Sequence, residues 1–352
     1  MTVYYFIFFA ISFVLSLAIT PFIIRLAHYI NAIDKPGPRK IHTQPIARLG
    51  GVVVILAFLL TLISIMIADP AKLEFTAEKI WRIDKNLFGV SSGILVLLIV
   101  GIWDDIKGIK AGYKLIFHFL AALIVVYFGV NIWWIRNPFS NLDVLLGNWT
   151  YLVVPVWIVL LINVTNWLDG ADGLATGVGF IASVVLFFLS VSPTVNQSST
   201  GLLAIVLSGA LLGFLVHNFN PAKIFLGDSG SMFIGFMLAI FAIISGGKLA
   251  TAALVMGLPI LDALWVIARR IISGESPWKA DRLHLHHRFL DAGFTQRQTV
   301  FSLYGISAIF GIIALSAKTQ QKMFLAFWLI VVMFAIALIL VKLKKNKNEK
   351  TV

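Results

Sequence analysis

Long apolar runs constrain the fold of this chain more than any other feature. A helix needs roughly 17–25 predominantly apolar residues to cross the hydrocarbon core of a bilayer. Candidate spans lie at 3–24, 50–68, 87–103, 115–135, 150–165, 174–191, 201–217, 230–246, 249–271, 299–317 and 323–341. Because 59% of the residues are hydrophobic and only 12% are charged, most of the surface is expected to face lipid. The sequence therefore predicts an all-α, polytopic integral membrane protein with about eleven transmembrane helices.

Basic residues set the expected orientation of these spans. Cytoplasmic loops of membrane proteins carry an excess of Lys and Arg. With the N-terminus outside and the C-terminus inside, 20 of the 28 Lys and Arg residues fall in cytoplasmic segments. The first apolar run lacks a basic leader and a small-residue cleavage site, so it is interpreted as a retained span. We expect one catalytic transmembrane domain at 1–341 in the inner (plasma) membrane, followed by a basic cytoplasmic tail at 342–352.

Bulk composition also limits the function classes. The net charge of +12 follows from the cytoplasmic loops, so no nucleic-acid partner is expected. The absence of Cys excludes disulfides, thiolate ligands and cysteine nucleophiles. The pairs Gly89/Gly93 and Gly209/Gly213 would let helices approach closely. Internal packing is the favoured interpretation, and the seam of a homodimer is the alternative.

Polar residues gather in five segments, and the expected topology places all five on the cytoplasmic side. Ionisable residues at membrane depth are costly and mark functional sites. The first segment, 34–51, offers Lys40 and His42 for phosphate contacts, with an ordinary basic loop as the alternative. The second contains the adjacent acids Asp104 and Asp105. Such a pair suits a magnesium–diphosphate centre, and a capping or solvated pair is the alternative.

The third segment, 163–173, is the most specific of the five. Asn163, Asn166, Asp169 and Asp172 recur every three residues, which on a helix would form a drifting polar stripe. Amide and carboxylate oxygens suit Mg²⁺, although the segment lacks the ligand order of an EF-hand.

The last two segments add one acid and a group of histidines. Asp228 stands between glycines just before a span, where metal ligation is favoured over a helix cap. The long polar segment 269–298 contains three histidines, but a zinc site is disfavoured because Cys and HExxH are absent and two arginines flank the histidines. Recognition of pyrophosphate and sugar hydroxyls fits better. Asp262 is interpreted as a structural contact beside a proline kink at Pro259.

Together these motifs resemble one family. DKPGPRKIH with RLGG, the DD pair with downstream lysines, NxxNxxDGxDGLA, FLGDSGS, PxxD with an Arg pair, and DRLHLHH occur in order between residues 34 and 290. The order resembles that of the polyprenyl-phosphate N-acetylhexosamine-1-phosphate transferases, the superfamily containing WecA, TagO and MraY. The His-Leu-His-His pattern and eleven spans are more similar to WecA and TagO than to MraY.

The resemblance implies a reaction and a set of roles. UDP-GlcNAc and undecaprenyl phosphate would give undecaprenyl-diphosphate-GlcNAc and UMP with Mg²⁺ (or Mn²⁺), at the start of cell-wall or surface-polysaccharide synthesis. Asp228 is an expected metal ligand, and its expected companion is Asn166 or an acid of the Asp169/Asp172 pair. Asp104, Asp105, Asp169 and Asp172 are the expected catalytic acids, of which the first two would orient or deprotonate the lipid phosphate. The expected substrate-binding residues are Lys40, His42, Lys114, Asn163, Arg282, His284, His286, His287 and Arg288.

Two alternatives stay open at this point. An MraY-like transferase of phospho-MurNAc-pentapeptide would use the same motifs. A secondary transporter would also place acids in its membrane spans. Against transport, the acids concentrate at one face and no inverted repeat is visible. UMP formation without any ion gradient would separate a transferase from a transporter.

Overall fold

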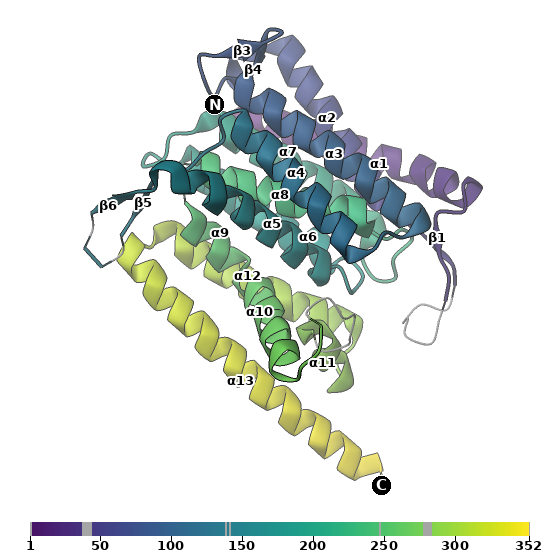
Figure 1. Ribbon diagram of the computed structural model, residues 1–352. Coiled ribbons are helices and arrows are strands. Elements are labelled where there is room, and N and C mark those ends of the chain that lie inside the picture. Colours follow the sequence, from purple (N-terminus) through teal and green to yellow (C-terminus); the bar gives the residue numbers. More distant parts are fainter. Residues whose placement is uncertain are drawn as a thin grey trace.

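The computed structural model describes residues 2–36, 44–137, 139–140, 142–245, 248–276 and 284–351. Helices account for most of these residues (Figure 1). In chain order they are α1 (Thr2–Tyr29), α2 (Gly50–Ala68), α3 (Lys85–Lys107), α4 (Ala111–Tyr127), α5 (Thr150–Leu168), α6 (Leu174–Val191), α7 (Ser198–Asn218), α8 (Gly227–Ile244), α9 (Leu249–Val255), α10 (Gly257–Ile272), α11 (Leu285–Asp291), α12 (Gln296–Ser316) and α13 (Thr319–Thr351).

Short elements occupy some of the connections. The 3₁₀ turns are η1 (Pro70–Leu73) and η2 (Gly147–Trp149). Antiparallel hairpins pair β1 (Ile33–Asp34) with β2 (Ile46–Ala47), β3 (Lys79–Ile80) with β4 (Ile83–Asp84), and β5 (Trp134–Arg136) with β6 (Asp143–Leu145).

The predicted all-α, polytopic architecture is confirmed, with two local differences. Within the described chain, nine helices are long and apolar enough to cross a membrane, and each of the eleven predicted segments contains a helix. The segment predicted at 115–135 is the shorter helix α4, which ends at Tyr127 and is followed by Gly129 in the left-handed region. The segment predicted at 249–271 is broken into α9 and α10, which meet at an angle of 79°.

The break between α9 and α10 corrects the expected proline kink. The chain bends at Met256, between the two helices, and Pro259 lies in the first turn of α10. Proline is tolerated there because the first N–H groups of a helix have no partner within the helix. The apolar sequence on both sides hid the break, since hydropathy alone does not distinguish one long helix from two short ones.

Helix α8 forms the centre of the bundle. In the most apolar 18-residue stretch of α8, 89% of the residues are buried, whereas only 11% are buried in the corresponding stretch of α13. Phe233, Ile234 and Phe236 are fully buried, and the helix packs on α5, α3 and α2. A helix that is apolar around its whole circumference is expected in such an interior position. By contrast, α13 lies along the edge of the bundle and extends beyond it (Figure 1).

Glycines bring α2 and α3 against the first turn of α8. A Cβ atom on Gly51 would stand 2.0 Å from the backbone nitrogen of Gly230, and one on Gly101 would stand 2.3 Å from Cα of Ser229. Because a side chain at either position would collide with backbone, glycine is required for this approach. The approach places the acidic end of α3 directly beside the start of α8.

The two Gly-x-x-x-Gly pairs pack inside the chain, as the favoured interpretation predicted. Gly209 and Gly213 of α7 face backbone carbonyls of α1, at Phe9 and Phe13. In α3, a Cβ atom on Gly89 would meet the side chain of Phe128, and one on Gly93 would meet Phe236. These glycines therefore serve contacts between helices of one molecule.

Candidate active site

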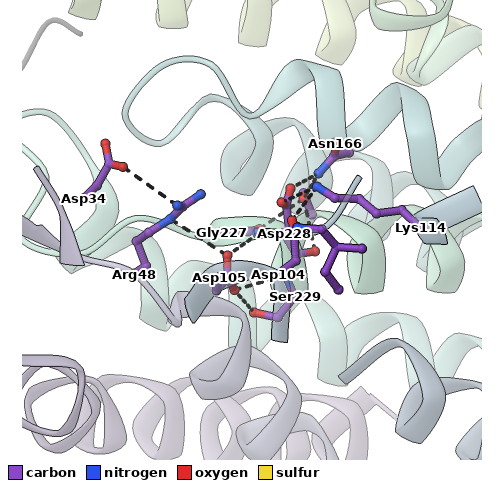
Figure 2. Close-up of polar contacts among 11 residues, drawn as sticks. Asp34, Arg48, Asp104, Asp105, Lys114, Asn166, Gly227, Asp228 and Ser229 are labelled. Carbon is purple, nitrogen blue, oxygen red and sulfur yellow. Dashed lines mark hydrogen bonds and ion pairs between the residues drawn. The ribbon is translucent and has the colours of Figure 1, made fainter. Parts of the chain in front are cut away.

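A connected group of polar side chains surrounds the first turn of α8 (Figure 2). The Lys114 ammonium on α4 donates to Asp228 Oδ2 at 2.7 Å and also pairs with Asp104 at the end of α3. Asn166, near the end of α5, donates through Nδ2 to Asp228 Oδ1 and, at 2.9 Å, to Ser231 Oγ. The second, third and fourth polar segments of the sequence therefore meet at Asp228.

Asp105 caps α8 from a neighbouring helix. Its carboxylate is fully buried and accepts from the backbone nitrogens of Asp228 (2.8 Å) and Ser229 (3.3 Å) and from Ser229 Oγ (2.7 Å). The first N–H groups of a helix have no partner within the helix, so this carboxylate satisfies them. Gly227 has a φ of +74°, and a Cβ atom there would stand 2.6 Å from Asp105 Oδ1. Asp105 therefore fixes the backbone that carries Asp228.

An arginine joins this cap to the first polar segment. Arg48 Nε lies 4.0 Å from Asp105 Oδ1, and its Nη1 lies 3.8 Å from Asp34 Oδ1 (Figure 2). Arg48 comes directly after β2, and Gly51, three residues later, contacts α8. In the sequence, Arg48 is the arginine of the RLGG motif, and nothing in that motif indicates its partners. Its pairing depends on the approach of α2 to α8, which sequence patterns did not reveal.

The two acids of the third segment lie beyond the end of α5 and have different environments. Burial, followed by the nearby Asp105 carboxylate, raises the pKa of Asp169 to about 7 against the opposing effects of Arg48 and the Gly227 N–H. Asp172 Oδ2 accepts from Asn220 Nδ2 at 2.9 Å. The expected polar stripe stops at Leu168, where α5 ends, so only its two asparagines lie on a helix.

Asn163 lies one helical turn deeper than Asn166 and faces another helix. Its Nδ2 donates to the Val159 carbonyl at 2.7 Å and lies 3.3 Å from Nδ1 of the buried His118 on α4. Asn163 was predicted to bind substrate, and the structure places it in the packing between α4 and α5. No sequence pattern pointed to His118, which lies in an apolar run.

A cavity of about 750 Å³ opens beside the carboxylates. This volume is within the range of roughly 300–1,000 Å³ that is typical of small-molecule sites. The polar and charged side chains that line it come from four of the five polar segments: Asp34, Gln44, Arg48, Asp169, Asp172, Asn218, Asn220, Lys223, His287 and Gln296. The cavity is therefore the place where a polar, charged substrate could reach the cluster.

Asp262 organises the start of the histidine segment. His284 Nδ1 lies 2.9 Å from Asp262 Oδ2, and the backbone nitrogen of Leu285 donates to Asp262 Oδ1 at 2.9 Å. Asp262 on α10 thus binds both the first histidine and the start of α11. The expected structural contact of Asp262 is present, and it holds a predicted substrate-binding residue.

The next histidine packs directly on the third polar segment. His286 is 3% exposed, and a Cβ atom on Gly170 would stand 2.2 Å from its Nε2. Burial, followed by the neighbouring His287 and His284, lowers the pKa of His286 well below its usual range. His286 is therefore neutral at physiological pH, and His287 beside it lines the cavity.

The remaining predicted residues have simpler placements. Arg288 lies in the last turn of α11. Lys40, His42 and Arg282 lie outside the described residues.

The side chains of the cluster can be compared with the ligands that Mg²⁺ usually takes in proteins. Nowhere in the described ranges do three His, Asp or Glu side chains form a group that could hold a metal ion by themselves. Mg²⁺ is usually bound through one or two carboxylates together with substrate phosphates and waters, so a closed protein cage is not required. The partly exposed Asp228 carboxylate, with Asn166 beside it, fits such an open site. In the structure the Lys114 ammonium occupies the space between Asp228 and Asp104.

Comparisons with known proteins show which sequences this chain is similar to. The model of the family described as glycosyl transferase family 4 matches residues 87–246. The chain is 31% identical to the "probable undecaprenyl-phosphate N-acetylglucosaminyl 1-phosphate transferase" of Bacillus subtilis (strain 168), over 94% of this chain and 90% of that protein. It is 32% identical to the decaprenyl-phosphate N-acetylglucosaminephosphotransferase of Mycobacterium leprae, over 79% of this chain and 75% of that protein. It is 31% identical to the phospho-N-acetylmuramoyl-pentapeptide-transferase of Thermoanaerobacter sp., over 85% of this chain and 94% of that protein.

Proposed function

Because the chain belongs to glycosyl transferase family 4, we propose that it transfers N-acetylglucosamine 1-phosphate from UDP-N-acetylglucosamine to undecaprenyl phosphate. The names of two relatives support a polyprenyl phosphate as acceptor and N-acetylglucosamine as the sugar. The observation that carries the proposal is the convergence of Asp104, Lys114, Asn166 and Asp228 at one end of membrane-spanning helices. Arg48, beside Asp105, and Gly227, beside Asp228, connect this cluster to a large polar cavity. A water-soluble donor and a membrane-bound acceptor can meet at such a place.

The reaction exchanges one phosphoanhydride for another. A phosphate oxygen of the acceptor attacks the β-phosphorus of the donor, the bond from that phosphorus to the bridging oxygen breaks, and UMP leaves with the electron pair. Little driving force is required, so the protein mainly has to position the reactants and compensate charge. The cavity beside Asp169 and Asp172 is the proposed donor site, with Arg48, Lys223 and His287 available for its phosphates and sugar.

The residues around α8 have separate proposed roles. Asp228 would hold Mg²⁺ with Asn166 beside it, and the ion would supply positive charge to the diphosphate of the donor. Lys114 contacts both Asp104 and Asp228, so its ammonium can reach an acceptor phosphate that approaches this pair. Asp105 positions Asp228 through the backbone of α8. Asp104 holds Lys114 and is the proposed residue that orients the acceptor.

The decisive experiment uses the purified full-length chain in detergent. UMP release would be measured with undecaprenyl phosphate, Mg²⁺ and a panel of UDP-sugars. We expect release with UDP-N-acetylglucosamine that depends on the lipid phosphate and needs no ion gradient. Preference for UDP-MurNAc-pentapeptide would instead assign the activity named in the Thermoanaerobacter relative. No release with any donor would refute the proposed reaction.

The proposed location of the reaction is the cytoplasmic face of the inner membrane. This location is supported by the excess of Lys and Arg in the loops that carry the active-site residues, because cytoplasmic loops of membrane proteins carry such an excess. Single cysteines at Gln44, Ile109 and Lys223 should react with a membrane-impermeant thiol reagent only after the membrane is opened. Cysteines at Thr76 and Gln197 should react in intact cells. The opposite labelling pattern would contradict this orientation.

A further inference from the structure

A second cavity lies at the opposite end of the helix bundle and belongs to no part of the proposed reaction. It has a volume of about 230 Å³ and lies where α3 and α7 begin and where α4 and α8 end. One of its lining residues, Ile244, is 16 residues after Asp228 on the same helix, which corresponds to roughly 24 Å. We call this cavity, lined by Asn86, Asn131, Gln197, Trp133 and Trp134 among others, the far pocket.

The far pocket contains side-chain amides whose hydrogen-bonding capacity is unused. Asn86 is 9% exposed, and its Oδ1 has no hydrogen-bond partner in the part of the chain that the structure describes. The same holds for Oδ1 of Asn131, and Gln197 contributes a third amide to the lining. Buried carbonyl oxygens are nearly always hydrogen-bonded in folded proteins, so two unsatisfied oxygens on one cavity call for a donor from a bound molecule.

A glycine keeps the space beside one of these oxygens open. Gly129 lines the far pocket with a φ of +104°, and a Cβ atom there would stand 3.0 Å from Asn86 Oδ1. Any other residue would be strained by this backbone conformation and would crowd the Asn86 oxygen. The chain turn after α4 therefore both forms the wall of the pocket and leaves room at the unpaired acceptor.

The rest of the lining restricts the chemistry of the ligand. None of the described residues that line the far pocket is charged, so a phosphate, a carboxylate or an ammonium group would find no counter-charge. Trp133 and Trp134, which are 51% and 45% exposed, supply broad apolar surface with polar edges. Amides can accept from and donate to hydroxyl groups, and indole faces pack against the C–H face of a sugar ring. From this combination we propose that the far pocket binds a neutral saccharide unit.

The saccharide could be free or could be the headgroup of a glycolipid. Phe139, Leu145 and Trp149 are exposed on or next to the β5–β6 hairpin, whose first strand contains Trp134 of the far pocket. Tryptophan and other amphipathic aromatic groups favour the headgroup level of a bilayer. Both sources share the same sugar chemistry, so the experiment includes one arm for each.

The binding experiment uses the full-length chain in phosphatidylcholine nanodiscs, because sugar-based detergents would compete. Methyl β-glucoside and methyl N-acetyl-β-glucosaminide serve as free probes, and monoglucosyl diacylglycerol incorporated in the nanodisc serves as the lipid probe. Saturation-transfer NMR reports binding of the free probes, and tryptophan fluorescence reports titration of the lipid. We expect saturable binding of at least one probe, because the amides and indoles already stand in place.

Three variants test the site itself. Asn86→Leu and Trp134→Ala should each raise the Kd at least about tenfold. Trp149→Ala, on an exposed tryptophan outside the lining, should leave the Kd of the free glycosides unchanged. Because Asn86 Oδ1 has no partner, Asn86→Leu should not lower the unfolding temperature, whereas a purely structural role for this amide would lower it.

Each result decides the proposal. Binding of a free glycoside shows that the sugar alone is recognised, and binding of the glycolipid only shows that the lipid supplies part of the affinity. No saturable binding of any probe overturns the proposal, as does binding that survives both Asn86→Leu and Trp134→Ala. The measurement uses neither UDP-sugar nor undecaprenyl phosphate, so its outcome is independent of the proposed transferase activity.

Discussion

Replacing Asp105 by Asn tests whether this residue acts by holding the first turn of α8. Asp105 Oδ1 accepts from the Asp228 nitrogen, and Oδ2 accepts from the nitrogen and the hydroxyl of Ser229. An asparagine keeps one acceptor oxygen and turns its NH₂ group toward the other donors. At least one hydrogen bond to a charged group is lost, at about 1.5–3 kcal/mol, and a donor faces a donor. We expect the free energy of unfolding to fall by about 2–4 kcal/mol.

The same substitution should slow the reaction, because Asp228 is carried by the backbone that Asp105 holds. We expect kcat for UMP release to fall about 10- to 100-fold, with a smaller change in KM for the donor. Ser229→Ala removes only one donor from a carboxylate that keeps two, so it should cost about 0.5–1.5 kcal/mol. Equilibrium unfolding in mixed micelles would give the free energies, and UMP release at saturating substrates would give kcat.

Asp84 provides a matched control at the other end of the same helix. It is buried and caps α3 by accepting from the backbone nitrogens of Asn86 and Leu87, and from those of Phe75 and Thr76. Asp84→Asn should therefore destabilise the protein by a similar amount while leaving kcat unchanged, since about 30 Å of helix separates it from Asp105. Equal losses of kcat in the two variants, or no loss of stability in Asp105→Asn, would refute the reasoning.

Three further predictions concern the metal, the division of roles and pH. Activity should be lost in excess EDTA and restored by Mg²⁺ or Mn²⁺ but unaffected by zinc-selective chelation, and full activity in EDTA would exclude the proposed centre. Asp228→Asn should lower kcat at least about 10²-fold, whereas His286→Ala should chiefly raise KM for the donor; the reverse pattern would make the histidine segment the metal site. Burial raises the pKa of Asp169 to about 7 from an unfolded value near 3.8, so the folded state holds an extra proton between these values. The free energy of unfolding without substrates should therefore fall as pH rises from 5 to 8, and Asp169→Asn should remove much of this dependence in thermal unfolding curves.

The spans and the polar segments could be predicted because each is a local property of the chain. Long apolar runs can form little other than membrane helices, and acids are too costly at membrane depth to occur there without a function. The pairing of side chains could not be predicted in this way. Asp104 and Asp105 are adjacent in sequence, but neighbouring residues on a helix point about 100° apart. The structure consequently turns Asp104 toward Lys114 on α4 and Asp105 toward α8.

Glycine contacts explain why these orientations were hidden from the sequence. The rotation of α3 is set where Gly101 packs on Ser229, and the position of α2 is set where Gly51 packs on Gly230. Both contacts join segments more than a hundred residues apart. A glycine in an apolar run carries no signal that identifies its partner. A capping pair was the alternative for Asp104 and Asp105 in the sequence, but only the structure shows that Asp105 caps α8.

The exposure of the carboxylates in the cluster shows which of them is open to the proposed cation. Lys114 pairs with Asp104 and Asp228, and Arg48 lies beside Asp105 and Asp34. Burial makes a charged group expensive unless it is paired. Asp105 is fully buried and engaged by α8, so it offers no free oxygen to an ion. Asp228 is the partly exposed member, and a phosphate can attract its lysine away, which would leave its carboxylate to the divalent ion proposed there.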